Sequence, residues 1–417
     1  MALIVQKYGG TSVAGADRMR SVAGRIARRS EAGDRLVVVV SAMGHTTDEL
    51  LALARQMTDR PEEREMDLLL STGEIVSCTL LAMALKHIGH RAVALSGAQA
   101  GIGTDRRYGR ARILKVDPKR IQGELARGNV VIVAGYQGMT EELDITTLGR
   151  GGSDTTAVAL AAALRAKRCE IYTDVDGIYT ADPRIEPKAF KLETISYEEM
   201  LELASYGATV MHPRAVELGA VYEMPILVAS SFTDAPGTLI GGASMTSPSG
   251  MEQRNKVSGI AADTDVARIT LRGVPDQPGI AARLFGPLAD AGISVDTIVQ
   301  NASVAQAGPG GERLTDLTFT VTRASLERAL EIVKPLAVEI GAPETLADTH
   351  LAKVSIVGAG MQSGPGYASR MFRTLFEAGI NIELITTSEI RITCLIDESQ
   401  VPVAVRALHK AFELEEA

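Results

Sequence analysis

The sequence predicts an α/β protein that combines one large sheet with a smaller module present twice. Over about the first 230 residues, short β-branched runs alternate with longer segments of helical period. The runs are apolar throughout, as in 37–40, which is typical of parallel strands covered by helices on both faces. Beyond residue 262 the same residues recur in the same order, which indicates an internal repeat.

The large sheet accounts for the first predicted domain, a three-layer αβα arrangement. Its predicted strands are 3–8, 36–41, 92–95, 130–134, 170–173 and 226–229, and helices such as 16–29 and 155–165 cover them. The stretch 237–255 is rich in Gly, Ser, Thr and Met without a clear period, which is typical of a linker. We therefore expect a first domain over 1–236, a linker over 237–262, and modules over 263–340 and 341–417.

The repeat is visible in the residues themselves. Pro278-Gly279, Phe285, Ala291-Gly292-Ile293 and Ile298 recur with one constant shift as Pro365-Gly366, Phe372, Ala378-Gly379-Ile380 and Ile385. Each copy predicts a strand (267–271; 352–357), a helix ending at Ala-Gly, a strand bearing Asp296 or Glu383, a third strand (317–322; 390–396) and a second helix (326–336; 403–412). With a closing strand, each module is a ferredoxin-like βαββαβ unit.

Bulk composition excludes several classes of function. A net charge of −8 argues against a large basic face for nucleic acid, so small-molecule chemistry fits better. The dispersed Cys78, Cys169 and Cys394 suit buried thiols in a reducing compartment, and the six histidines lack zinc-ligand spacing, so no protein metal site is expected. No apolar run approaches the roughly 20 residues that span a bilayer, and no signal peptide is evident, so we expect a cytoplasmic protein without membrane contact.

The first motif follows the first strand and reads Lys7-Tyr8-Gly9-Gly10-Thr11-Ser12. Paired glycines let backbone N–H groups close on phosphate oxygens, a helix start adds positive dipole, and the lysine adds a full charge. This pattern predicts a phosphate cradle. By itself it is also compatible with a surface lysine beside an ordinary turn.

The second motif reads Gly149-Arg150-Gly151-Gly152-Ser153-Asp154-Thr155 and precedes an apolar helix. Ser153 or Asp154 would cap that helix well, which is a purely structural explanation of both. Arginine, glycines and free N–H groups at a helix start also suit an anionic substrate group. Both explanations can hold together.

Three further segments are weaker on their own. The segment 172–184 ends a strand with closely spaced Asp, Thr and Tyr residues, and its spacing does not match a calcium-binding loop. Ser41, followed by Thr46 and Thr47, lies just after a buried strand. In Ser71-Thr72-Gly73-Glu74 the glutamate is expected in the first turn of an apolar helix, where a carboxylate favours the dipole. Each segment alone is more often structural.

Taken together, these motifs resemble the aspartokinase branch of the amino acid kinase family, and the repeat resembles a pair of ACT domains. The resemblance covers nearly the whole chain, with the motifs in the family's order. It implies an amino acid kinase domain followed by two ACT domains. It also implies ATP-dependent phosphorylation of the β-carboxylate of L-aspartate to 4-phospho-L-aspartate, with Mg²⁺, as the first step toward lysine, threonine and methionine.

The resemblance also implies roles for individual residues. Lys7, Arg150 and Asp154 are the expected catalytic residues. ATP is expected to contact Lys7, Tyr8, Gly9, Gly10, Thr173, Asp174, Tyr179, Asp182, Arg184, Thr209 and Val210, and aspartate to contact Ser41, Thr47, Glu74, Arg150, Gly151, Gly152 and Ser153. The chemistry agrees, because aspartate brings one ammonium and two carboxylates and so needs both an acceptor and donors. The attacking carboxylate is already ionised near neutral pH, so no general base is expected.

One departure from the family pattern concerns a missing charge. Where the family commonly reads G-A-K-V-L-H-P, this chain has Thr209 in place of the lysine. Either Arg214 or Arg184 compensates, or ATP binds more weakly.

The ACT-like pair implies regulation by an amino acid, and lysine, threonine or both are the expected effectors. The matching residues are Asp276, Gly279, Ile280, Ala281, Ser294, Val295, Asp296, Gln300, Asn301, Asn381 and Ile382. Alternatively, Gly279 and Gly366 only shape turns, and Asp296 is a solvated acid. A homo-oligomer is expected, or assembly with a regulatory chain made separately from a start near Met251.

Two rival functions remain open. One is a kinase of the same fold acting on acetylglutamate, glutamate, carbamate or a nucleotide, which Glu74 and the ACT-like pair disfavour. The other is a non-catalytic amino acid sensor, which the intact Lys7, Arg150 and Asp154 disfavour. A Rossmann dehydrogenase is weaker still, because Gly9-Gly10 lacks the G-x-G-x-x-G spacing.

Overall fold

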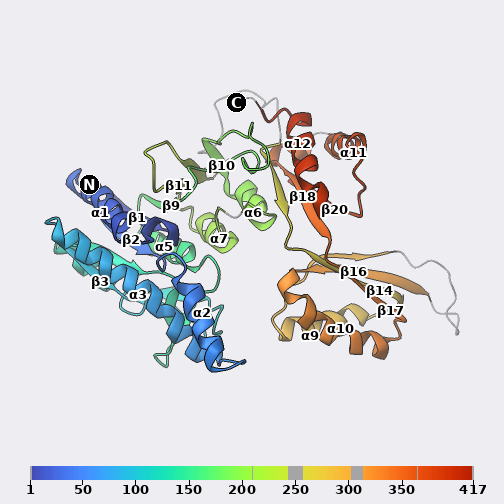
Figure 1. Ribbon diagram of the computed structural model, residues 1–417, viewed down its shortest axis with the longest axis horizontal. Coiled ribbons are helices and arrows are strands. Elements are labelled where there is room, and N and C mark those ends of the chain that lie inside the picture. Colours follow the sequence, from blue (N-terminus) through green and yellow to red (C-terminus); the bar gives the residue numbers. More distant parts are fainter. Residues whose placement is uncertain (1, 209, 243–256, 302–312, 364, 416–417) are drawn as a thin grey trace. The chain divides into compact units, whose positions relative to one another are not determined.

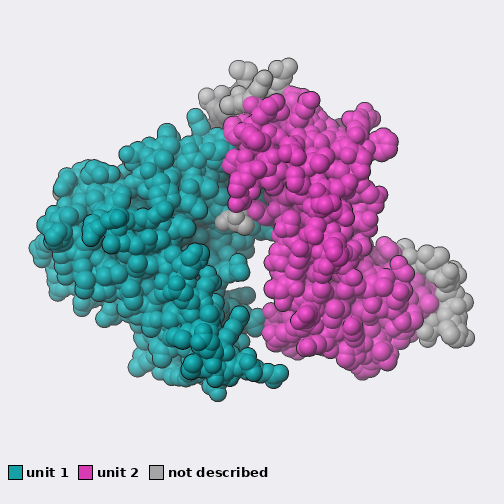
Figure 2. Space-filling view, in the orientation of Figure 1, with its two compact units in different colours: residues 1–180, 191–205, 209–252 teal, residues 181–190, 206–208, 253–417 magenta. Residues whose placement is uncertain are grey.

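The computed structural model describes residues 2–208, 210–242, 257–301, 313–363 and 365–415. The chain divides into two compact units, coloured separately in Figure 2. Unit 1 comprises Met1–Thr180, Lys191–Ser205 and Thr209–Glu252, and unit 2 comprises Ala181–Phe190, Tyr206–Ala208 and Gln253–Ala417. Two short segments within the predicted first domain therefore group with unit 2.

Unit 1 is built on an eight-stranded sheet with the order β10-β12-β11-β9-β1-β2-β6-β3 (Figure 1). Neighbouring strands are parallel except for the antiparallel pair β11 and β12. The strands are β1 Leu3–Tyr8, β2 Arg35–Val40, β3 Ala92–Leu95, β6 Val130–Ala134, β9 Arg168–Thr173, β10 Thr194–Ser196, β11 Ile226–Ser230 and β12 Thr238–Gly241. The six predicted strands are all present, with ends that differ by at most two residues.

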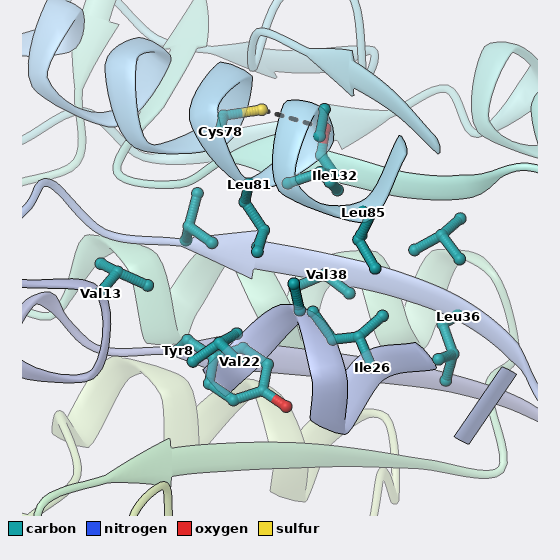
Figure 3. Close-up of a cluster of buried hydrophobic side chains, with 14 of the residues drawn as sticks. Tyr8, Val13, Val22, Ile26, Leu36, Val38, Cys78, Leu81, Leu85 and Ile132 are labelled. Atoms are coloured by element: carbon teal, nitrogen blue, oxygen red, sulfur yellow. Dashed lines mark hydrogen bonds between the residues drawn. The ribbon is translucent and has the colours of Figure 1, made fainter. Parts of the chain in front are cut away.

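Helices cover both faces of this sheet, as the apolar strands predict. Residues 36, 38 and 40 of β2 pack with α1 (Ala16–Glu31) and α3 (Glu63–His87) in one apolar cluster, shown in Figure 3. Ile26, Leu81 and Leu85 are fully buried there, and each such side chain contributes about 1.5–3 kcal/mol. The alternate residues of β2 point to the opposite face, where α5 (Gly152–Ala163) lies against β1, β2 and β9.

Further elements of unit 1 surround this framework. A four-stranded sheet has the order β5-β4-β7-β8. Its strands and the additional helices are β4 Ile102–Thr104, β5 Ile113–Val116, β7 Gln137–Met139, β8 Ile145–Thr147, α2 Thr46–Met57, α4 Lys119–Ala126, α6 Tyr197–Ser205 and α7 Pro213–Val221. The small sheet has no counterpart among the predicted strands, since its strands are too short to show a clear period.

One described helix, α3, is long and apolar enough to cross a membrane by length and composition. Half of its most apolar stretch is buried inside the unit, and the buried Asp67 and Glu74 lie on it. A helix with these features is typical of the core of a folded domain. Length and composition alone are therefore weak evidence that α3 spans a membrane.

The first ACT-like module of unit 2 is contiguous in sequence. It contains β14 Ala267–Pro275, α9 Ile280–Asp290, β15 Asp296–Gln300, β16 Leu314–Val321, α10 Leu326–Ile340 and β17 Glu344–Asp348. The sheet order is β15-β16-β14-β17, with β17 as the predicted closing strand. The apolar face of the sheet and both helices enclose a core that includes Leu284, Phe319 and Val333.

The second module differs from the prediction in one strand. It contains β18 Leu351–Val357, α11 Tyr367–Glu377, β19 Leu384–Thr387, β20 Arg391–Asp397 and α12 Val401–Ala411. Its sheet order is β13-β18-β20-β19. The closing position is taken by β13 (Gly259–Asp263), which precedes the first module and pairs antiparallel with β18. The expectation of a closing strand following in order was therefore wrong for this module.

The predicted linker also contains more regular structure than expected. Strand β12 lies within 237–262 and β13 overlaps its end; β12 pairs with β11 and with the more distant β10, and β13 pairs with β18, which is far away in sequence. Backbone pairing stabilises both where local sequence gives no signal. The three cysteines are free and buried, as predicted.

Candidate functional site

The site lies where β1, β2 and β9 end at the same edge of the large sheet. The N–H of Gly9 donates to the carbonyl of Tyr172 at 3.1 Å, and the N–H of Gly44 donates to the carbonyl of Gly10 at 3.1 Å. A Cβ at Gly10 would lie only 2.7 Å from the carbonyl oxygen of Ala42. Close approach of two loops therefore explains this glycine. The helix start expected here is a 3₁₀ turn (Gly10–Val13), and α1 begins at Ala16.

Lys7 and Asp154 meet at the centre of this edge. The Nζ of Lys7 is 2.7 Å from an Oδ of Asp154, and the side chains are only 12% and 10% exposed. The sheet provides Lys7 near the end of β1, and α5 provides Asp154 in its first turn. A charged pair this poorly solvated is a structural requirement or part of a site that binds charge.

The start of α5 corrects one expectation. The N-cap is Gly151, which has φ 65° and no side-chain cap, so neither Ser153 nor Asp154 caps the helix. Both are 7% exposed within the first turn. Asp154 is thus available to Lys7, and a Cβ at Gly135 would lie 2.7 Å from the Oγ of Ser153, which places Ser153 beside the end of β6.

Glu74 is buried in the middle of α3 rather than in the first turn of a helix, because α3 begins eleven residues earlier, at Glu63. One carboxylate oxygen accepts from the N–H of Ala42 at 3.2 Å, and the other has no hydrogen-bond partner among the described residues. Burial raises the pKa of Glu74 to about 7. Gly73 permits the contact, since a Cβ there would lie 2.9 Å from the Cβ of Ala42. An unpartnered buried carboxylate oxygen is suited to a cation.

The remaining residues predicted to contact aspartate differ in how deeply they are buried. Ser41 and Thr47 are half-buried, at the end of β2 and in the first turn of α2. Thr46 donates to the carbonyl of Met43 at 2.7 Å and so shapes the loop between them. Arg150 is exposed and, within the described part of the chain, has no hydrogen-bond or ion-pair partner. The structure thus brings Lys7, Ser41, Glu74 and Asp154 to one edge and leaves Arg150 at the surface.

The predicted nucleotide contacts fall into two groups. Tyr8 is fully buried and stacks on Tyr172 with ring centroids 4.9 Å apart, so only its backbone is available to a ligand. The Oγ1 of Thr173 donates to Asp174 at 3.1 Å, and the hydroxyl of Tyr179 donates to Asp176 at 2.8 Å. Asp182 and Arg184 belong to unit 2 and pair with each other at 2.7 Å. Val210 is half-buried, and Thr209 lies outside the described residues.

Arg214, one proposed substitute for the missing lysine, has a local role. Its guanidinium donates to the carbonyls of Leu148 at 2.6 Å and Ala111 at 3.0 Å. It therefore anchors the loop that leads into Arg150. Burial lowers its pKa, and the nearby Arg112 adds to this effect.

Several residues of this region were missed by sequence analysis. Asp67 is 1% exposed and accepts from both the N–H and the hydroxyl of Thr147, at 2.8 and 2.6 Å. Burial raises its pKa against the lowering effect of these bonds. His212 caps α7 by accepting from the N–H of Arg214 at 3.3 Å. The signal available for Asp67 was a lone acid within an apolar helix, and the signal for His212 was its match to the histidine of the G-A-K-V-L-H-P pattern.

The predicted effector residues lie in unit 2. Gly279 and Gly366 have φ 93° and 106° and are the N-caps of α9 and α11, which supports the turn-shaping explanation of both. Asn301 lines a hollow of about 500 Å³ with Arg268 and Glu383. Asn381 lines another of about 150 Å³, which also includes Glu383. The other predicted residues lie at the start of α9, at the ends of β15 or in the loops beside these elements and β19: Asp276, Ile280, Ala281, Ser294, Val295, Asp296, Gln300 and Ile382.

Comparison with protein families identifies both parts of the chain. The model of the amino acid kinase family matches residues 2–230. Two ACT domain models match residues 269–338 and 354–412.

Individual relatives match over the full length. An aspartate kinase of Stutzerimonas stutzeri is 50% identical over 100% of this chain and 98% of its own. An aspartokinase of Corynebacterium glutamicum is 50% identical over 99% of this chain and 97% of its own. The structure of aspartokinase III of E. coli in complex with aspartate and ADP is 26% identical, with a TM-score of 0.80 over 98% of this chain and 99% of that one.

Proposed function

This chain belongs to the amino acid kinase family as an aspartate kinase, and on that premise we propose how its residues act and how it is regulated. It transfers the γ-phosphoryl of ATP to the β-carboxylate of L-aspartate and forms 4-phospho-L-aspartate. This product opens the route to lysine, threonine and methionine. The observation that carries the proposal is the meeting of the Lys7–Asp154 pair and the buried Glu74 at one edge of the sheet.

Glu74 binds the ammonium group of aspartate. Its second carboxylate oxygen is buried and has no partner among the described residues, so an ammonium there gains a charge-assisted hydrogen bond that no described protein group provides. The two carboxylates of aspartate need donors, which Ser41, Thr47, Ser153 and the N–H groups at Gly151 and Gly152 supply. Arg150 completes the site by moving from its exposed position onto a carboxylate.

Lys7 and the glycines after it bind the phosphates of ATP. The lysine neutralises charge that develops during transfer, and Asp154 holds it in place at 2.7 Å. Thr173, Asp174, Tyr179 and Val210, all in unit 1, are proposed to contact the rest of the nucleotide. Mg²⁺ bound to the phosphates would neutralise part of their charge. No base is needed, so alignment of the ionised carboxylate with the γ-phosphoryl supplies most of the catalysis.

The ACT domains bind lysine, threonine or both and inhibit the kinase. Support comes from the two modules in unit 2 and from a solved relative, aspartokinase III of E. coli, which has been crystallised with lysine and aspartate in a T-state. That structure is 26% identical, with a TM-score of 0.73. We place the protein in the cytoplasm, since buried free thiols suit a reducing compartment. A homo-oligomer, or assembly with a chain started near Met251, completes the proposal; Met251 lies outside the described residues.

Aspartate-dependent release of ADP tests the catalytic part. Wild type should release ADP with aspartate, and far less with glutamate, acetylglutamate, carbamate or a nucleotide as acceptor. Glu74→Gln should raise the KM for aspartate about tenfold or more while the KM for ATP changes less than twofold. Glu65→Gln, an exposed glutamate on the same helix, is the matched control.

The outcomes separate the rival functions. Release of ADP with another acceptor but not with aspartate would assign a different substrate. Absence of release with every acceptor, from a protein that still binds lysine or threonine, would make it a sensor. Activity that neither lysine nor threonine changes would remove the regulatory part and leave the kinase intact.

A further inference from the structure

A short segment between α6 and α7 is bound by the regulatory half of the chain. Tyr206–Ala208 belongs to unit 2, although α6 and α7 belong to unit 1. Gly207 has φ 121°, and a Cβ there would collide with the carbonyl oxygen of Ala262 in β13. Only glycine allows this backbone to approach the strand so closely.

The ring of Tyr206 contacts two cations. The Cζ of Arg391 lies 3.8 Å from the ring centroid, and the Nζ of Lys353 lies 5.5 Å from it. Both distances are within the range of cation–π attraction, and such contacts are strongest where water is excluded. Here Lys353 is 4% exposed and Arg391 is 8% exposed.

The two cations belong to one face of the second ACT sheet. In the pairing of β18 with β20, Val357 lies opposite Arg391, and Ser355 lies opposite Thr393. Because side chains alternate along a strand, residues 353, 355, 391 and 393 share a face. These four side chains are polar and buried beside the apolar Val357 and Leu395, and the hydroxyls of Ser355 and Thr393 bond each other at 2.7 Å. A polar buried face needs specific partners, and Tyr206 is one of them.

Lys353 also contacts the first ACT domain, through an ion pair with Asp296 at the start of β15. Burial would raise the pKa of Asp296, but the hydrogen bond and the charge of Lys353, together with smaller contributions from the N–H of Thr297 and the charge of Arg391, outweigh burial, so the pKa is lowered. Asp296 is one of the predicted effector residues. A charged amino acid that binds there competes with Lys353 for the carboxylate, and Lys353 is one of the two cations facing Tyr206.

The residues that follow Tyr206 in the sequence lead to the catalytic site. Six residues further on, His212 caps α7, and its imidazole lies against Gly151, where a Cβ would collide with the ring. Gly151 is the N-cap of α5, whose first turn contains Ser153 and Asp154. A displacement of His212 therefore acts on the turn that holds the partner of Lys7.

We propose that Tyr206 is a positioning residue, through which Lys353 and Arg391 of the second ACT domain fix the His212 segment and the first turn of α5. The inference rests on the proposed kinase activity and adds the route by which the effector site reaches it. Binding at Asp296 removes the ion pair that holds Lys353 beside the ring, which loosens Tyr206 and misaligns the turn.

Three substitutions test this role in the full-length protein. Tyr206→Leu removes the π face and keeps an apolar side chain of similar volume, so kcat without effector should fall about tenfold and the remaining activity should respond less to lysine and threonine. Tyr206→Phe keeps the face and should restore kcat to within twofold of wild type. Tyr222→Leu, at an exposed tyrosine just after α7, should match wild type.

Equal kcat and equal inhibition in wild type and Tyr206→Leu would overturn the proposal. If Tyr206→Leu melts below the assay temperature, Arg391→Gln replaces it, because that change removes one cation and keeps the tyrosine. Arg391→Gln should then lower kcat at least threefold, and wild-type kinetics would overturn the proposal equally. Failure of wild type to phosphorylate aspartate would instead reject the proposed function, since the comparison of variants needs an active parent.

Discussion

Lys7 and Asp154 form a nearly desolvated ion pair, 2.7 Å long, between the end of β1 and the first turn of α5. The pair joins the two motifs, and its two residues lie more than 140 positions apart in the sequence. It holds the lysine charge at the edge of the sheet where the phosphates are proposed to bind.

Lys7→Met should lower kcat by about 10²–10³-fold, the cost of losing one preorganised group that stabilises transition-state charge. The substitution also leaves Asp154 buried without a partner, so the protein should lose roughly 3–5 kcal/mol of stability. The double variant Lys7→Met/Asp154→Asn should regain most of that stability without regaining activity. Recovery of activity in the double variant would show that Lys7 acts only on folding. Lys86→Met, at an exposed lysine, is the control.

The KM for aspartate should depend on pH through Glu74. The pKa of Glu74 is about 7 in the folded protein, and only the carboxylate form binds an ammonium group well. Below pH 7 the KM for aspartate should therefore rise roughly tenfold per pH unit, whereas Glu74→Gln should show a high KM without this slope. The KM for aspartate of wild type and of Glu74→Gln, measured between pH 6 and 8, tests this dependence, and the KM for ATP is the internal reference. A slope that persists in Glu74→Gln would assign it to another group.

Glu74 should also make stability depend on pH, in the direction of its raised pKa. The ordinary pKa is 4.5, so between about pH 4.5 and 7 the folded protein holds a proton that the unfolded chain releases. The contribution of Glu74 to the free energy of unfolding is greatest below this window and falls as pH rises through it. The total loss is on the order of 3 kcal/mol at most, and the contribution is constant above the window. Urea unfolding of wild type and Glu74→Gln at pH 5 and 7.5, without aspartate, should show this difference only in wild type.

Gly151→Ala should damage the turn before α5. Gly151 has φ 65°, and a Cβ there would collide with the ring of His212. We expect a loss of about 1–3 kcal/mol of stability and a lower kcat. The matched control is Gly123→Ala within α4, where a Cβ meets nothing within 4 Å and should add about 0.5–1 kcal/mol. Equal melting temperatures for the two variants would contradict the strain at Gly151.

The regular parts of the fold were predictable because their apolar periods are local. The run 37–40 reads as a buried parallel strand in any context, and β2 confirms it. Strand β13 could not be predicted, because five residues with little pattern become a strand only by pairing with β18, more than ninety residues later. Long-range pairing of this kind leaves no mark on a short segment.

In the candidate site, too, residues in local motifs were predictable, and residues that depend on contacts distant in sequence were not. Lys7 and Asp154 were found from local glycine-rich motifs, and the structure brings them together. Glu74 was found in a segment misplaced before a helix, because Gly73 suggested a boundary where the glycine in fact permits a close contact with Ala42. Asp67 was missed because its partners, Thr147 and Gly109, come from loops that local patterns do not connect to α3.

The strand β13 makes the two ACT domains topologically inseparable. It is the edge strand of the second domain and is joined to β18 only through the whole of the first. Cleavage between the two domains would leave the second without an edge strand and expose the backbone of β18 for pairing with other chains. Any separately produced regulatory chain must therefore begin ahead of Gly259, a condition that a start at Met251 satisfies and one at the first residue of β14 does not.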